Sequence, residues 1–200
     1  MKKIAVLLSG RGSNFISIKK QIDEKNINGE IVAVISNKAD AKGLEYAREQ
    51  GLCATYLNPK DFDGREAYDA EIVRILKEKN VDLVCLAGFM RIITGVFCQA
   101  FRNRILNIHP SLLPSFKGLD AQKQAFDYGV KFAGCSVHFV DEEMDNGAII
   151  LQAVVPVLQT DDDHSLAERI LKEEHRIYPE AVRLFCDDKL RVEGRKVFID

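Results

Sequence analysis

The sequence predicts an α/β fold with a mostly parallel central sheet, for three reasons. Short apolar runs rich in Val and Ile alternate with segments of helical periodicity, which is the pattern of βαβ units. A glycine-rich turn directly follows the first of these runs, at residues 9–14. The 200 residues, 46% of them hydrophobic, suffice for one domain that buries a sheet and still forms a cleft. We therefore expect a single domain over residues 1–200.

The apolar runs are the expected strands, and they lie at residues 4–8, 31–36, 54–57, 83–87, 105–108, 136–140 and 149–155. Segments of helical period lie between them, at residues 14–25, 43–50, 65–79 and 121–128. Asp63 or Gly64 could cap the third of these helices, and Gly51 could end the second.

The last third of the chain predicts one long helix and a hairpin. Residues 165–185 keep apolar side chains at helical spacing, and Pro179 near their middle predicts a kink or a break. Residues 190–199 form two alternating runs around Glu193 and Gly194, which is typical of a terminal hairpin.

Composition excludes several classes of function. The 28 basic residues nearly balance the 30 acidic ones without a basic block, so no nucleic acid and no anionic membrane is expected as a partner. The apolar run after Met1 stops at Ser9, which favours a strand over a signal peptide, and no later run could span a bilayer. The five cysteines are scattered and form no Cys-x-x-Cys pair, which favours a reducing cytoplasm and argues against a zinc site.

The glycine-rich turn Ser9-Gly10-Arg11-Gly12-Ser13-Asn14 is the first candidate site. Between a strand and a helix, exposed backbone N–H groups and the helix dipole favour an anion such as a phosphate. The turn lacks the Gly-Lys-Ser/Thr of a Walker loop, and Phe15 replaces the third glycine of a dinucleotide fingerprint. A phosphomonoester fits better than a dinucleotide, and a purely structural tight turn is the alternative.

Asn107 and His109 are the second candidate, at the end of the strand that precedes Pro110. Residues two apart in a strand point to the same side, so both side chains would project together where open α/β sheets bind ligands. An amide can stabilise an oxyanion while an imidazole moves a proton, which suits acyl-type transfer without a metal. The alternative is that both side chains satisfy backbone groups at the strand end.

A third candidate is the acidic loop that follows the strand at residues 136–140. A carboxylate brought close to His109 would favour the charged imidazolium, and we select Asp145 among the acids of this loop. A solvated acidic surface is the alternative. His138 alternates with apolar residues on the same strand, so it is either a hydrogen-bonded core histidine or a support of the catalytic group.

These segments resemble the glycinamide ribonucleotide formyltransferase family over nearly the whole chain. The most specific matches are residues 86–92, residues 107–114, and residues 136–140 leading to Asp145 and Gly147. The resemblance implies a doubly wound, Rossmann-like sheet, with a phosphate site in the first half of the chain and a folate cleft toward the second. Two departures are Asp120, where relatives usually carry histidine, and Asn146-Gly147-Ala148, where they carry x-Gly-Pro.

The resemblance also implies roles for individual residues. The substrates would be glycinamide ribonucleotide and 10-formyltetrahydrofolate, in purine biosynthesis, with no metal. Asn107, His109 and Asp145 would form the catalytic set, with His138 as a possible support. The glycinamide substrate would be held by Gly12, Ser13, Asn14 and Glu174. The folate would contact Arg65, Met90, Arg91, Ile92, Ile93, Asn107, Val140 and Asp141.

Other acceptors remain open at this point, because an Asn-x-His-Pro core also occurs in a tRNA formyltransferase and in formyltetrahydrofolate hydrolase. We expect neither, since the sequence shows no further domain of the kind those enzymes carry and its first turn suits a small phosphorylated acceptor. A non-catalytic nucleotide-binding module is the alternative from another class. A monomer and a homodimer are both compatible with the sequence.

Overall fold

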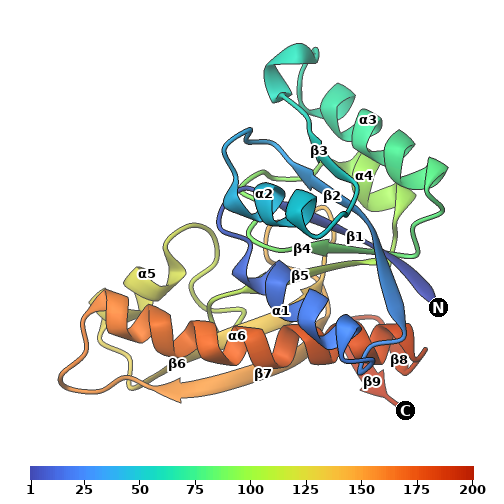
Figure 1. The fold of residues 1–200 in the computed structure, drawn as a ribbon. Helices are drawn as coiled ribbons and strands as arrows, with labels where there is room; N and C mark the ends of the chain where they lie inside the picture. Colours follow the sequence, from blue (N-terminus) through green and yellow to red (C-terminus); the bar gives the residue numbers. More distant parts are fainter.

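Seven strands form one sheet through the centre of the computed structural model, which describes residues 1–200 (Figure 1). The order across the sheet is β3-β2-β1-β4-β5-β6-β7. The first five strands are parallel, whereas β6 is antiparallel to both of its neighbours. The strands are β1 (Lys2–Leu8), β2 (Gly29–Ser36), β3 (Ala54–Tyr56), β4 (Leu83–Leu86), β5 (Ile105–His109), β6 (Phe132–Phe139) and β7 (Ile149–Pro156).

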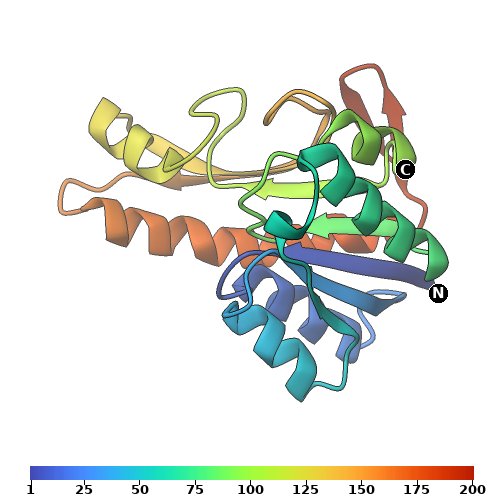
Figure 2. The same cartoon turned by 90° about the horizontal axis from the view of Figure 1, so that it is seen from above.

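Helices cover both faces of this sheet. Alternate residues of each strand point to opposite faces, and in β1 this puts Ile4, Val6 and Leu8 into one core and Ala5 and Leu7 into the other. The helices of the first core are α1 (Ser13–Asp23), α2 (Lys42–Glu49), α5 (Ala121–Tyr128) and α6 (Asp163–Cys186). Those of the second are α3 (Arg65–Glu78) and α4 (Gly95–Ala100), which lie side by side in Figure 2. The expected α/β fold with a mostly parallel sheet is confirmed.

Local sequence explains most helix ends. Gly64 precedes α3 with a φ of 93°, which is easy only for glycine, and Gly51 with a φ of 68° follows α2. Asp162 and Ser165 form a capping box at the start of α6. None of the helices combines the length and apolar character needed to cross a membrane.

The expected elements are found within a few residues of their predicted bounds, with three differences. The short helix α4 was not expected, and a 3-10 turn (Pro59–Asp61) precedes α3. Of the two alternatives predicted at Pro179, a kink or a break, the break does not occur, because α6 runs unbroken through this residue. Tyr178 anchors this stretch: it is fully buried, and its hydroxyl lies 3.0 Å from both the Leu86 and Leu106 carbonyl oxygens. The terminal hairpin was predicted correctly, as β8 (Leu190–Glu193) and β9 (Lys196–Ile199).

The strand order reverses between β1 and β4. Strands β2 and β3 follow on one side of β1, and the chain then crosses back to place β4 and β5 on its other side. Ligands of open α/β sheets bind beyond the carboxyl ends of the strands at such a switch point. The turn after β1 and the segment after β4 both lie there, joined by a hydrogen bond from the Ser9 N–H to the Gly88 carbonyl at 3.0 Å. The fold therefore brings two of the candidate segments together.

Candidate active site

Strands β5 and β6 bring together the polar groups of the second and third candidates. Their antiparallel register pairs Asn107 with His138 and His109 with Ser136. His109 is 5% exposed and His138 is 1% exposed, so both imidazoles are almost completely removed from solvent. A pair of neighbouring strands thus presents an amide and two imidazoles to one small volume.

Asp145 reaches the same place from the loop between β6 and β7. Its Oδ2 lies 3.5 Å from His109 Nδ1 and accepts a hydrogen bond from the Gly118 N–H at 2.9 Å. The loop achieves this with Asp145 in the left-handed region, at a φ of 49°. His109 Nε2 lies 2.9 Å from the carbonyl oxygen of Phe116, so that nitrogen is a donor. A proton on Nδ1 as well would make the ring an imidazolium paired with Asp145.

His138 holds the Asn107 amide in one orientation. Its Nδ1–H donates to the Phe139 carbonyl at 2.8 Å, which leaves Nε2 to accept from Asn107 Nδ2 at 3.2 Å. Burial lowers the pKa of His138, which favours the neutral ring that this pattern requires. One N–H of the Asn107 amide is therefore used by the protein and the other remains to act on a ligand.

The turn that follows His109 is fixed by a buried serine that sequence reasoning missed. Ser136 Oγ donates to the Ser111 carbonyl at 2.7 Å and accepts from the Leu113 N–H at 3.0 Å. Gln152 Nε2 adds bonds to Ser136 Oγ at 2.8 Å and to the Leu113 carbonyl at 3.1 Å. The only signal in the sequence was a serine within an apolar strand. Such serines are too common for this one to be selected as a functional residue.

The glycine-rich turn and α6 form the other polar centre. Gly12 has a φ of 75°, and a Cβ on it would lie 2.9 Å from the Gly43 Cα, so only glycine fits between the turn and α2. Ser13 begins α1, and Asn14 Nδ2 donates to Glu174 Oε2 at 2.7 Å across the α1–α6 contact. Asn14 and Glu174 are 8% and 7% exposed, and Asn14 Oδ1 is buried without a hydrogen-bond partner.

Glu174 connects this centre with the strand that carries His138. Burial raises the pKa of the Glu174 carboxyl, and the bond from Asn14 opposes that rise. Burial, and secondarily the charge of Glu174, raise the pKa of the Cys135 thiol on β6 to about 12. Cys135 precedes Ser136, the residue paired with His109. The acid therefore lies near β6, on the α6 face of the sheet that Cys135 occupies, whereas Ser136 and His138 point to the opposite face.

Ser9 links the glycine-rich turn to the segment after β4. It is 5% exposed, and its hydroxyl accepts the Met90 N–H at 2.8 Å and donates to Asn37 Oδ1 at 2.5 Å. The sequence offered no reason to select this serine over its neighbours. Its role follows from the neighbouring positions of β1 and β4 in the sheet.

The residues expected around a folate lie in three environments. Met90 and Ile92 are 64% and 54% exposed, which is unusual for large apolar side chains and suits contact with an apolar ring. Arg91 places its guanidinium 4.6 Å from the centre of the Tyr68 ring. Ile93 is buried in the core beneath α3 and α4, so only its backbone could touch a ligand.

The remaining three candidates lie around this segment. Arg65 begins α3, and its charge, like that of Arg91, acts on the Asp69 carboxyl. Val140 is half-buried, and its N–H donates to the Ile105 carbonyl at 3.0 Å. Asp141 is exposed and organises its own loop, with bonds from the Glu143 N–H at 3.0 Å and from Asn146 Nδ2 at 3.3 Å.

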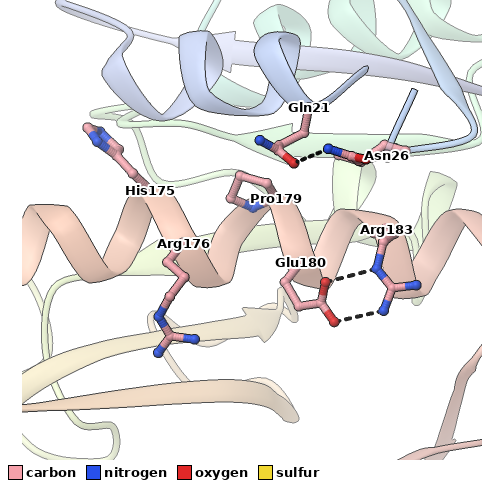
Figure 3. A pocket seen from close by; sticks show the side chains of 8 residues that line it. Gln21, Asn26, His175, Arg176, Pro179, Glu180 and Arg183 are labelled. Carbon is pink, nitrogen blue, oxygen red and sulfur yellow. Dashed lines mark hydrogen bonds and ion pairs between the residues drawn. The ribbon is translucent and has the colours of Figure 1, made fainter. Parts of the chain in front are cut away.

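A cleft of about 200 Å³ lies elsewhere, along the contact between α1 and α6 (Figure 3). Most of its polar groups are paired within the cleft: Arg183 with Glu180 at 2.8 and 2.9 Å, and Asn26 with Gln21 at 2.9 Å. No candidate residue lines it. No group of three or more His, Cys, Asp or Glu side chains has the arrangement of a metal site.

An amide donor, an imidazole and a carboxylate that meet in one cluster at the ends of β5 and β6 define an α/β enzyme of the acyl-transfer type. Residues 2–182 match the family described as formyl transferase. The chain belongs to the formyl transferase family.

Relatives and solved structures agree with this membership. The chain is 44% identical to the phosphoribosylglycinamide formyltransferase of Escherichia coli, over 98% of this chain and 93% of that protein. It is 49% identical to a trifunctional purine biosynthetic protein of Drosophila melanogaster, over 93% of this chain but only 14% of that much longer protein. The crystal structure of glycinamide ribonucleotide transformylase 1 from Symbiobacterium toebii superposes with a TM-score of 0.98 at 54% identity, over 100% of this chain and 94% of that one.

Proposed function

We propose that this enzyme transfers the formyl group of 10-formyltetrahydrofolate to the amine of glycinamide ribonucleotide, a step of purine biosynthesis. The meeting of Asn107, His109 and Asp145 in one cluster is the observation that carries the proposal. The similarity to phosphoribosylglycinamide formyltransferases over nearly their full length supports the choice of acceptor. The single domain would hold the glycinamide substrate with the turn after β1 and with α6, and the folate with the segments after β4 and β6.

The acceptor would lie along the polar centre at α1 and α6. The backbone N–H groups of Gly12, Ser13 and Asn14 at the start of α1 suit the phosphate. The Glu174 carboxylate would accept a hydrogen bond from the glycinamide end of the substrate. The buried, unpartnered Oδ1 of Asn14 supports this placement, because a buried acceptor without a donor is costly unless a ligand supplies one.

The formyl donor would lie against the segment after β4. Met90 and Ile92 would contact its ring, and Arg65 and Arg91 carry charges opposite to those of a folate tail. Val140 and Asp141 would border the ring from the other side, at the start of the loop that carries Asp145. The formyl group would then point toward Asn107 and His109.

In the reaction the amine nitrogen bonds to the formyl carbon and the bond from that carbon to folate N10 breaks. The proton that the amine loses ends on N10. The free N–H of Asn107 and the imidazolium of His109 would donate to the formyl oxygen as it gains charge, and Asp145 would stabilise the imidazolium. For His109 Nε2 to reach a substrate, the Phe116 carbonyl must first leave its present position.

The test mixes purified protein with 10-formyltetrahydrofolate and glycinamide ribonucleotide and follows the folate absorbance. Formylation of glycinamide ribonucleotide in a one-to-one ratio with folate release is expected. Methionyl-tRNA and water serve as competing acceptors. Folate turnover without glycinamide ribonucleotide would indicate a hydrolase, and no turnover with any acceptor would refute the proposal.

A further inference from the structure

Both loops that border the proposed folate side meet the short helix α4. The segment after β4 leads directly into it through Thr94. The loop with Asp141 and Asp145 is attached to it by two contacts: Cys98 Sγ lies 3.3 Å from the Asp141 carbonyl oxygen, and Gln99 Nε2 lies 3.4 Å from a Glu142 carboxylate oxygen. Any displacement of α4 would therefore move both walls of this side of the site.

A helix of six residues does not hold its place by itself, because isolated helices of that length are unstable. Phe97 and Phe101 bury one face of α4 in the core shared with α3. The start of α4 is fixed by Asp69 of α3, whose Oδ2 accepts the Thr94 N–H at 2.6 Å. Asp69 is only 2% exposed.

A buried carboxylate is a costly way to fix a backbone group, since burial disfavours its charged form. Burial raises the pKa of Asp69, and the bond from Thr94 together with the charges of Arg91 and Arg65 opposes that rise. One face of α3 carries Arg65 together with Tyr68 and Asp69, which follow Arg65 by three and four residues. This face contacts both the Arg91 guanidinium and the backbone that follows it.

We propose that Asp69 is a positioning residue for the folate side: by fixing the start of α4 it places the segment after β4 and the loop of Asp141 and Asp145. It touches no substrate and acts only through these two segments. The inference rests on the proposed function, because it assigns the ligand of these segments as folate. The glycinamide side, built on α1 and α6, is not attached to α4 through any of these bonds.

The test compares Asp69→Ala and Asp69→Asn with Glu71→Ala, an α3 carboxylate that is paired with Arg74 on the outer surface. Asp69→Ala should raise the KM for 10-formyltetrahydrofolate about tenfold, the effect of losing one charge-assisted hydrogen bond, while the KM for glycinamide ribonucleotide stays within about twofold. Asp69→Asn should raise the folate KM only about threefold, because its amide oxygen can accept the same N–H. Glu71→Ala should leave both values unchanged.

Calorimetric binding of tetrahydrofolate, measured without glycinamide ribonucleotide, separates this inference from the proposed function. Wild-type binding without any formyl transfer would refute the function, and the same titration on the variants would still decide the role of Asp69. An unchanged folate affinity in Asp69→Ala would overturn the inference. Equal losses for both substrates, with a lower Tm, would also overturn it by indicating a general structural role. If the alanine variant does not fold, an unchanged folate affinity in Asp69→Asn has the same meaning.

Discussion

The glycinamide side and the folate side of the proposed site hold their polar groups in different ways. On the glycinamide side, Asn14 and Glu174 belong to the long helices α1 and α6 and are both nearly buried. On the folate side, Met90, Asp141 and Asp145 lie on loops whose positions depend on a few hydrogen bonds. The first side is organised by helix packing, and the second by bonds between loops.

This difference separates what each side can do. Helix packing keeps a buried acid and an unpartnered amide oxygen in place before any substrate arrives, which lowers the ordering cost of binding. The loop side can shift by breaking single bonds, such as the one between His109 Nε2 and the Phe116 carbonyl. Variants that loosen the loop side should therefore weaken folate binding, and variants on the helix side should weaken binding of glycinamide ribonucleotide.

The largest effect is expected from the histidine and carboxylate that meet between these sides. His109→Ala and Asp145→Asn should each lower kcat by about 10²–10⁴-fold, because they remove the proton-transfer group and the charge that stabilises it. Steady-state kinetics measure this, with the exposed His164→Ala as a control that should behave as wild type. A kcat close to the wild-type value in either variant would remove that residue from the mechanism.

The second effect concerns the amide. Asn107→Ala should lower kcat by about 10²–10³-fold with little change in either KM, because an oxyanion donor acts mainly in the transition state. His138→Phe should show a smaller loss of the same kind, since it leaves the amide present but free to rotate. The two changes combined should cost little more than Asn107→Ala alone. If the losses in kcat of the two single variants multiply in the double variant, His138 does not act through the Asn107 amide.

Sequence pattern predicted the strands and long helices because their periodicity is strong over many residues. It missed α4, since Gly95–Ala100 spans too few residues to show a period and its helix depends on burying Phe97 and Phe101 against α3. A similar dependence on tertiary packing explains why α6 is not broken at Pro179. The helix continues there because burial of both flanking turns and the Tyr178 hydroxyl contacts outweigh one lost backbone bond.

Within the site, local spacing could place Asn107 and His109 on one side of a strand but could not supply their partners. The pairing of His138 with Asn107 depends on the antiparallel register of β5 and β6, which is set by the whole sheet. Asp145 was selected from the four acids of its loop only as a carboxylate that could approach His109, and its position also requires a left-handed backbone conformation that the sequence does not indicate. Ser9 and Asp69 act across distances in the chain that no local pattern covers.

The third prediction tests the glycinamide side. Glu174→Gln should raise the KM for glycinamide ribonucleotide about threefold, because its amide oxygen can still accept a hydrogen bond but without the charge of the carboxylate, with the folate KM unchanged. Glu173→Gln is the matched control. Glu173 is the adjacent acid on α6, and its own carboxylate is paired with Arg176 at 2.6 Å. A change in the folate KM of similar size would contradict the separation of the two sides.

The variant Glu174→Gln should weaken substrate binding, but it should raise the thermal stability of the protein at high pH. Burial raises the pKa of Glu174, so the folded protein holds this proton to higher pH than the unfolded chain does. The stability that comes from this raised pKa is fully present below the pKa of the unfolded chain. It is lost as the pH rises through the pKa of Glu174 in the folded protein. Glu174→Gln removes that loss, so its Tm should exceed that of the wild type at pH 8 and approach it near pH 4. Thermal unfolding at the two pH values measures the difference.

An effect of similar size, but on both substrates, is expected from Ser9, which joins the two sides through its bonds to Met90 and Asn37. Ser9→Ala leaves the Met90 N–H without its acceptor, a loss of about 1 kcal/mol, so both KM values should rise about three- to fivefold together. Ser165→Ala, which disrupts the capping box of α6, should lower the Tm without this joint change. A rise confined to one substrate would show that the two sides are independent, and that Ser9 belongs to that side alone.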